Sequence, residues 1–180
     1  MRLSGRCICN RNLCMMRTRG RRSLATGRDV RASIFPCAIE LTPWLFANFD
    51  VNYCRARDRD AVKGQDYLPL AVPLSSTGGL DFRLRNGISG GLSYRYMKDR
   101  PASADNSLTA QGYFVTDLTA NYSRSKWEVG LEVQNLLNRK WREAQFETNS
   151  RMRGEAAPVD GISFTPGVPL FAKVKVGVFF

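Results

Sequence analysis

The sequence predicts an all-β protein whose antiparallel strands form part of a transmembrane β-barrel. Three observations support this prediction. Apolar and polar residues alternate over several separate segments, as they do in a strand with one apolar and one polar face. The connections between these segments are short and long in turn, as in barrels whose turns are short on one side of the membrane. The chain also has no apolar run of about 18 residues, so we expect no transmembrane helix.

The segment from Leu170 to Phe180 shows the alternation most clearly. Its apolar face carries Leu170, Ala172, Val174, Val176, Val178 and Phe180, and its other face includes Lys173 and Lys175. A tilted strand needs about 9–11 residues to cross a bilayer, and this segment is long enough. In a barrel, the apolar face would meet lipid and the lysines would face the interior.

Five further segments repeat the alternation with the same phase. They run over residues 45–54, 74–84, 88–96, 114–122 and 127–134. A seventh candidate spans Arg31 to Leu41, where Pro36 lacks the N–H that a strand ladder uses. We therefore expect about seven antiparallel strands in a curved sheet.

The connections support a barrel over a soluble sandwich. Short turns are expected at residues 41–44, 84–87 and 123–126, and Asn86-Gly87 is a strong hairpin signal. Long connections are expected near residues 58–73, 99–111 and 148–169. A soluble antiparallel β-sandwich that acts as a binding module has no reason to separate loop lengths in this way. A small self-standing outer-membrane barrel, the other alternative, would need a further strand.

Residues 1–32 differ from the rest of the chain. They contain nine arginines and one acidic residue, and so hold +8 of the total charge of +11. They show no hydrophobic period. We expect this segment to be an unpatterned basic head, disordered or translated in a shifted reading frame, and residues 33–180 to be the barrel portion. A basic targeting segment and a nucleic-acid-binding arm are the alternatives.

The sequence offers no residues for catalysis and no cofactor motif, so an enzyme is not expected. Cys7, Cys9 and Cys14 lie in the head, but the chain has no histidine and no second cysteine pair at ligand spacing, so no metal site is expected. Nucleic-acid binding is not expected, because the strand faces carry balanced charge. The first residues lack the apolar core of a secretory signal peptide.

Several segments resemble the TonB-dependent outer-membrane receptors. Residues 41–53 resemble a barrel hairpin common in that family, and residues 113–118 resemble a strand with a valine–aspartate pair. Residues 133–141, Val-Gln-Asn-Leu-Leu-Asn-Arg-Lys-Trp, resemble the family's Asn-Leu-Phe-Asp-Lys-Tyr segment, which is the most specific likeness. Residues 165–169, before a last strand that ends in phenylalanine, resemble the family's ending.

The resemblance implies that residues 33–180 are the last strands of a roughly 22-stranded barrel. The implied function is uptake of an iron–siderophore or similar nutrient at the cell outer membrane. The implied partners are outer-membrane lipid, the TonB system, the barrel-assembly machinery and a siderophore-type ligand. The remainder of the barrel and its plug would lie outside this chain, so we expect that it does not transport by itself. The last strand would carry the assembly signal, at Val174, Val176, Val178 and Phe180.

Charged residues on the interior face are expected to form a lining of compensating ion pairs. They are Asp50, Asp81, Arg83, Arg95, Asp117, Glu128, Glu132, Lys173 and Lys175. Trp44, Trp127 and Trp141 lie near strand ends, where interfacial aromatic residues are typical. The candidates for ligand contact are Tyr67 and Phe164, because functional residues concentrate on loops.

Overall fold

The computed structural model is an all-β protein. It describes residues 2–10, 13–23, 27–151 and 153–180, with side chains from residue 27 onward. The strands are β1 (Arg2–Asn10), β2 (Leu13–Ser23), β3 (Arg28–Thr42), β4 (Leu45–Asp58), β5 (Leu74–Arg83), β6 (Ile88–Met97), β7 (Arg100–Pro101), β8 (Thr109–Ala110), β9 (Tyr113–Ser123), β10 (Trp127–Gln134), β11 (Arg142–Ser150), β12 (Val159–Pro166) and β13 (Phe171–Val178). Among these residues no helix could cross a membrane.

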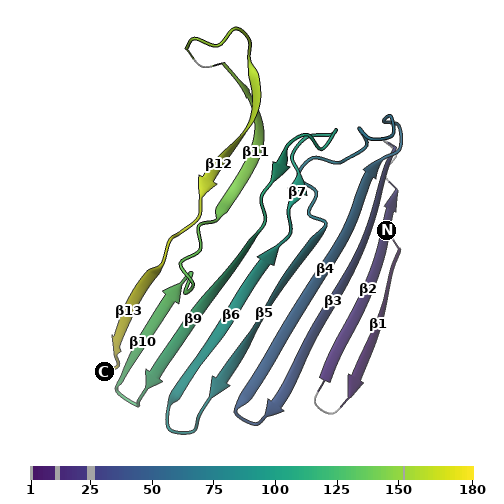
Figure 1. The fold of residues 1–180 in the computed structure, drawn as a ribbon. Coiled ribbons are helices and arrows are strands. Elements are labelled where there is room, and N and C mark those ends of the chain that lie inside the picture. The colour runs from purple at the N-terminus through teal and green to yellow at the C-terminus, as the bar shows by residue number, and fades with distance from the viewer. Residues whose placement is uncertain (1, 11–12, 24–26, 152) are drawn as a thin grey trace.

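Nine strands form one antiparallel sheet in the order β1-β2-β3-β4-β5-β6-β9-β10-β13. The seven strands predicted from the sequence are all present, as β3, β4, β5, β6, β9, β10 and β13. Tight hairpins join them at one end of the sheet and long connections at the other (Figure 1). At the predicted Asn86-Gly87 turn, Gly87 adopts a φ of 88°, which favours glycine.

The strand register confirms that the predicted faces share one phase. Leu92 lies opposite Leu118, which in turn lies opposite Val133. Val133 lies opposite Ala172, so the same face continues onto the last strand. Below, the face that carries these residues is called the apolar face, and the opposite one, with Glu128, Glu132 and the two lysines of β13, is called the polar face.

Aromatic side chains on the apolar face cover glycines of neighbouring strands. The Tyr94 ring lies over Gly78, where an added Cβ would come within 2.9 Å of the ring. Phe82 covers Gly90 in the same way, at 2.9 Å. Tyr94 also stacks on Phe114, with ring centroids 5.7 Å apart, and such aromatic pairs add about 0.5–1.5 kcal/mol each beyond area burial. These contacts tie β5, β6 and β9 together without a second layer of structure.

The apolar face is uncovered in this structure. Val174, Val176 and Val178 are 66%, 68% and 60% exposed. A soluble sandwich would bury such a face against a second sheet, and no second sheet covers it among the described residues. The sheet is curved and not closed, and β1 and β13 form its two edges, as in a part of a barrel.

Two strands of the structure lie within the basic head. Residues 2–10 and 13–23 form β1 and β2, and β2 pairs with β3. Backbone pairing alone accounts for this, because an open edge of β3 presents N–H and C=O groups to any extended segment. The register of β2 and β3 stops at Met15 opposite Cys37 and resumes at Thr18 opposite Ile34, so the ladder is interrupted at Pro36.

Two of the long connections contain strands that the sequence analysis did not predict. β11 and β12 pair as a hairpin that extends beyond the end of the sheet (Figure 1). β7 and β8 form a two-residue ladder within the connection between β6 and β9. The buried core lies at the base of these connections, where Ala102, Ala110 and Val115 are at most 2% exposed.

Candidate functional site

The polar face carries compensating ion pairs between neighbouring strands. Lys173 lies 2.8 Å from Glu132, and Lys175 lies 2.8 Å from Glu128. Arg95 of β6 lies 3.1 Å from Asp117 of β9. These three pairs match the lining that the sequence predicted. Among the described residues, no ion pair joins Asp50, Asp81 or Arg83, so that part of the prediction is not met.

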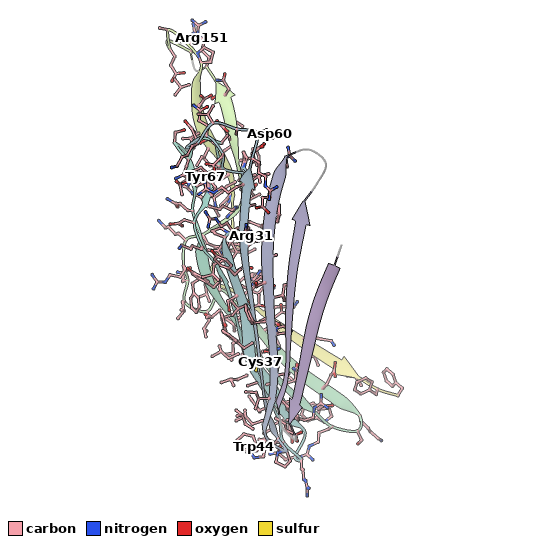
Figure 2. All side chains as sticks on the ribbon, turned by 90° about the vertical axis from the view of Figure 1, so that its right-hand side faces the viewer. Arg31, Cys37, Trp44, Asp60, Tyr67 and Arg151 are labelled. Atoms are coloured by element: carbon pink, nitrogen blue, oxygen red, sulfur yellow. The ribbon has the colours of Figure 1, made fainter. Side chains whose placement is uncertain are left out.

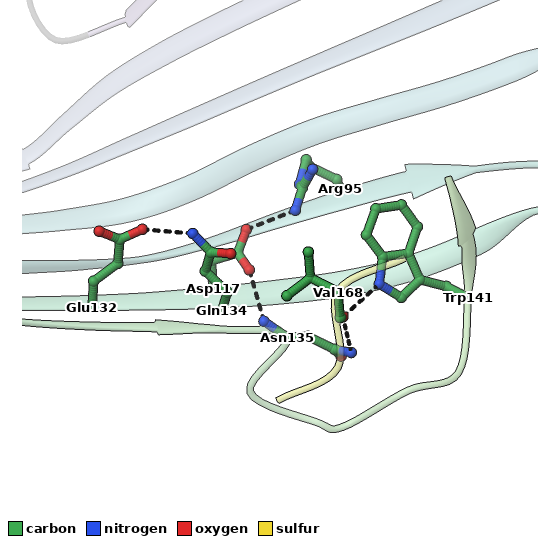
Figure 3. A network of polar contacts seen from close by, with 7 residues as sticks. All are labelled: Arg95, Asp117, Glu132, Gln134, Asn135, Trp141 and Val168. Atoms are coloured by element: carbon green, nitrogen blue, oxygen red, sulfur yellow. Dashed lines mark hydrogen bonds and ion pairs between the residues drawn. The ribbon is translucent and has the colours of Figure 1, made fainter. Parts of the chain in front are cut away.

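Asp117 connects this lining to the chain that leaves β10. One carboxylate oxygen accepts a hydrogen bond from the Arg95 guanidinium at 3.1 Å, and the other accepts from the Asn135 backbone N–H at 2.9 Å (Figure 3). Next to it, the Gln134 side chain donates to Glu132 at 2.8 Å. The first residue after β10 is therefore fixed by a carboxylate from the neighbouring strand.

Asn135 ties together the two ends of the connection between β10 and β13. Its side chain is 1% exposed and its φ is 51°, a left-handed conformation that asparagine tolerates. Its amide donates to the carbonyls of Arg139 and Val168, at 2.8 and 3.0 Å, and its side-chain oxygen accepts from the Arg139 N–H at 2.9 Å. Val168 lies shortly before β13, which begins at Phe171, so the Asn135 side chain holds both the start and the end of the connection.

Trp141 completes a cluster of aromatic and charged groups beside Asn135. Its indole N–H donates to the Val168 carbonyl at 3.0 Å (Figure 3). The centre of its ring lies 4.8 Å from that of Tyr113. The Arg95 guanidinium lies 5.6 Å from the Trp141 ring centre. Trp141 thus takes part in this polar network, and its interfacial position stays a prediction. We call Arg95, Asp117, Asn135 and Trp141 the mouth network.

Gln145 joins two of the long connections. Its side chain is 3% exposed and makes two hydrogen bonds with the backbone of Gln111. The Gln111 N–H donates to the side-chain oxygen at 2.8 Å, and the side-chain amide donates back to the Gln111 carbonyl at 2.6 Å. The β11–β12 hairpin is therefore anchored to the connection between β6 and β9.

The structure places the two predicted ligand contacts apart from each other. Tyr67 forms an isolated antiparallel bridge with Arg57, whose guanidinium lies 3.6 Å from the centre of its ring. Phe164 lies on β12 and is 48% exposed, with the Arg142 guanidinium 4.0 Å from its ring centre. Only Phe164 belongs to the connection that Asn135 and Trp141 anchor. Ligand contact by either residue stays a prediction.

The predicted assembly residues lie on the edge strand and just beyond it. Val174, Val176 and Val178 occupy the apolar face of β13, and Phe180 follows the strand with its side chain fully exposed. Among the residues with described side chains, no group of three or more histidine, cysteine, aspartate or glutamate residues could hold a metal ion. The side chains of Cys7, Cys9 and Cys14 lie outside those described.

The roles of Asn135 and Gln145 were not predicted from the sequence. Asn135 and Asn138 both follow a strand at short spacing, and asparagine is enriched at positive φ, so a turn with left-handed residues could have been predicted there. Asn138 does adopt a φ of 48°. Nothing in the local sequence marks Gln145, since its partner is 34 residues away.

Comparison with known families agrees with this geometry. The chain has no match among curated proteins. The model of the family described as "TonB dependent receptor-like, beta-barrel" matches residues 26–136, which is more than half of the chain. The chain belongs to this family. Members of the TonB-dependent receptor family are outer-membrane transport receptors and not enzymes.

Solved structures of two uptake or import receptors and of a copper transporter share the fold. The ferric yersiniabactin uptake receptor FyuA from Yersinia pestis is 13% identical with a TM-score of 0.68, over 98% of this chain and 29% of that receptor. The copper transporter OprC is 15% identical with a TM-score of 0.69, over 94% and 30% of the two chains. The ferric-catecholate import receptor Fiu from E. coli K12 is 16% identical with a TM-score of 0.63, over 94% and 25%. This chain thus spans less than a third of the length of each.

Proposed function

We propose that this chain is the C-terminal portion of a TonB-dependent receptor that takes up an iron–siderophore or similar metal chelate. The observation that carries the proposal is the mouth network, in which Asp117 and Asn135 fix the long connection 135–170 to the polar face. Such a face lines the interior of an outer-membrane barrel, and the long loops stand on the extracellular side. The connection is thereby held where an incoming ligand would first meet the barrel.

The side chains at the loop end of the sheet suit an anionic aromatic chelate. Arg95 faces the Trp141 ring, and Arg142 faces the Phe164 ring at 4.0 Å. Guanidinium groups bind carboxylates and phenolates by hydrogen bonds, while aromatic rings supply apolar contact area. Phe164 is the better candidate for direct contact, because its side chain is exposed, whereas Tyr67 is half-buried.

We also propose which surroundings and partners the chain has. The apolar face would meet outer-membrane lipid, and Val174, Val176, Val178 and Phe180 would be recognised by the barrel-assembly machinery. The rest of the barrel and a plug would come from outside these 180 residues, and the TonB system would supply the energy. The coverage of 25–30% of the solved receptors supports this arrangement.

The test is uptake by a receptor that contains this segment. It would be expressed in cells that lack other siderophore receptors, and uptake of radiolabelled iron would be followed with several siderophores, with and without TonB. We expect TonB-dependent uptake of at least one chelate. Uptake that continues without TonB, or passage of small solutes without selectivity, would contradict the proposal.

A pair of variants tests the proposed contact. Phe164→Ala should weaken chelate binding about tenfold, as loss of a large aromatic contact does. Phe146→Ala is the matched control, because Phe146 is 47% exposed on the same hairpin but lies opposite Ser163, on the other face from Phe164. Equal losses for the two variants would show that Phe164 makes no specific contact.

A further inference from the structure

The apolar face changes character abruptly at the loop end of β3 and β4. Along β4 it carries Phe49, Val51 and Tyr53, and then Arg55 and Arg57. Arg31 lies opposite Arg55 in β3, and Asp29 lies opposite Arg57, so all four residues share this face. Figure 2 shows Arg31 and Tyr67 toward the loop end of the sheet and Trp44 at the hairpin end. The charges therefore begin where the apolar band stops.

These residues line a hollow of about 380 Å³, here called the arginine hollow. Its cations are Arg31, Arg55, Arg57, Arg59 and Lys63. Its carboxylates are Asp29, Asp58 and Asp66, so the lining has an excess of two positive charges. The Tyr67 ring lies under Arg57, 3.6 Å from its guanidinium carbon, and holds that side chain in place.

The carboxylates do not compensate all of the arginines. Arg57 lies 2.8 Å from Asp66, while Arg31 and Arg59 share Asp29 at 3.5 and 3.1 Å. No ion pair joins Arg55 or Lys63 among the described residues. Like charges directly opposite each other in an antiparallel pair are destabilising, and Arg31 and Arg55 are placed in this way. An anion between them would remove the repulsion.

We propose that the arginine hollow binds a phosphate group. Guanidinium groups bind phosphate with two parallel hydrogen bonds, and the facing pair Arg31 and Arg55 offers two such groups from neighbouring strands. The place of the hollow at the edge of the apolar band is the level of lipid headgroups, where basic pockets bind anionic lipids. A phosphate monoester on an outer-leaflet glycolipid and free inorganic phosphate share this chemistry, and the experiment separates them.

The test uses a receptor that contains this segment, folded in detergent micelles. Three probes would be titrated and followed by calorimetry: inorganic phosphate, a diglucosamine lipid with two phosphate monoesters, and the same lipid with both phosphates removed. We expect the phosphorylated lipid to bind and the dephosphorylated lipid to bind at least about tenfold more weakly. Binding of inorganic phosphate alone would assign the hollow to the free anion. Equal binding of the two lipids, with none of phosphate, would overturn the proposal.

Variants locate the site. R31Q/R55Q should weaken phosphate-dependent binding about tenfold or more, and R31K/R55K, which keeps the charge but not the paired hydrogen bonds, should lie between it and the unchanged chain. R85Q/K126Q removes the same charge from exposed turns at the opposite end of the sheet and should leave binding unchanged. Equal losses in this control would show that only net charge matters and would overturn the proposal. Because R31Q/R55Q also removes a like-charge pair, the sheet should fold at least as well, which circular dichroism checks.

Discussion

Asn135 performs two tasks that few other side chains could combine. Its φ of 51° would strain most residues, and its fully buried amide satisfies two carbonyls and one N–H. An apolar replacement would leave those groups without partners in a site closed to water. The cost of such unsatisfied groups, rather than the loss of contact area, should dominate.

We therefore expect Asn135→Ala to lower the free energy of unfolding by about 1–3 kcal/mol. Asn106→Ala is the control, because Asn106 has a similar φ of 59° but is exposed. The control should show only the strain of a left-handed alanine. The measurement is urea unfolding in micelles, followed by the fluorescence of the adjacent Trp141. Equal effects of the two substitutions would show that the side-chain hydrogen bonds of Asn135 add little.

Asp105, in the loop between β7 and β8, provides a test by pH. Hydrogen bonds from the Ser103 hydroxyl, and then from the backbone and hydroxyl of Ser107, lower the pKa of Asp105 to about 2 from its ordinary value of 3.8. A lowered pKa means that the carboxylate favours the folded loop fully above about pH 4, and that this contribution is lost as the pH falls through about 2. Carbon NMR of the carboxyl group should show this titration. Ser103→Ala should move the pKa of Asp105 upward, and an unchanged pKa would contradict the assigned cause.

At the scale of elements, the two faces of the sheet should respond differently to charge. Val176→Arg places a cation on the apolar face, opposite Val129, and should destabilise the lipid-embedded barrel by about 2–4 kcal/mol if the site is near the midplane. Lys175→Arg, one residue away, keeps a cation near Glu128 on the polar face and should be nearly silent. The variants would be compared by unfolding from lipid vesicles, in a receptor that contains the segment. Equal tolerance would show that the apolar face does not meet lipid.

The strands that the sequence predicted and those that it did not differ in their surroundings. β4 and β13 alternate because one face carries an apolar band and the other carries polar or charged residues. β11 has polar residues on both faces, with Gln145 and Glu147 on one and Thr148 and Ser150 on the other. The β11–β12 hairpin stands beyond the end of the sheet, so neither of its faces must be apolar and the alternation that marks a strand is absent. Similarly, the lining of ion pairs follows from the alternation, whereas the bonds of Asn135 depend on Val168 returning beside it from 33 residues away.

The basic head also contains strands that the sequence did not predict. β1 and β2 extend the sheet, yet their sequence has no apolar alternation that would place one face against lipid. We propose that residues 1–32 are not part of the evolved barrel and that the strand ladder of residues 33–180 stands without them. Removal of residues 1–26, which leaves β3 complete, should leave the unfolding midpoint in micelles unchanged, as followed by circular dichroism. A marked drop in the midpoint, or stoichiometric zinc bound through Cys7, Cys9 and Cys14, would contradict this.

At the scale of the whole molecule, the decisive feature is that the sheet does not close. β1 and β13 each have a neighbour on one side only among the described residues, so both edges present unpaired N–H and C=O groups. In hydrocarbon each unsatisfied group costs several kcal/mol, and spanning sheets are therefore closed barrels. The 180 residues therefore form part of a barrel wall, with an apolar and a polar face, but not a closed barrel.

This predicts that the 180-residue chain by itself forms no stable transmembrane barrel. Expressed behind an added signal sequence, it should show no heat-modifiable migration on gels, which is the mark of a closed barrel, and it should aggregate through its edges. A receptor that contains the segment, run beside it, should migrate differently before and after heating. The open edges would then explain why the 180-residue chain forms no barrel, because its two faces are the same as those of the segment within the receptor. A heat-modifiable, protease-resistant species from the 180 residues alone, or siderophore uptake by cells that express only this chain, would mean that the sheet closes on itself and that the chain is a small complete barrel.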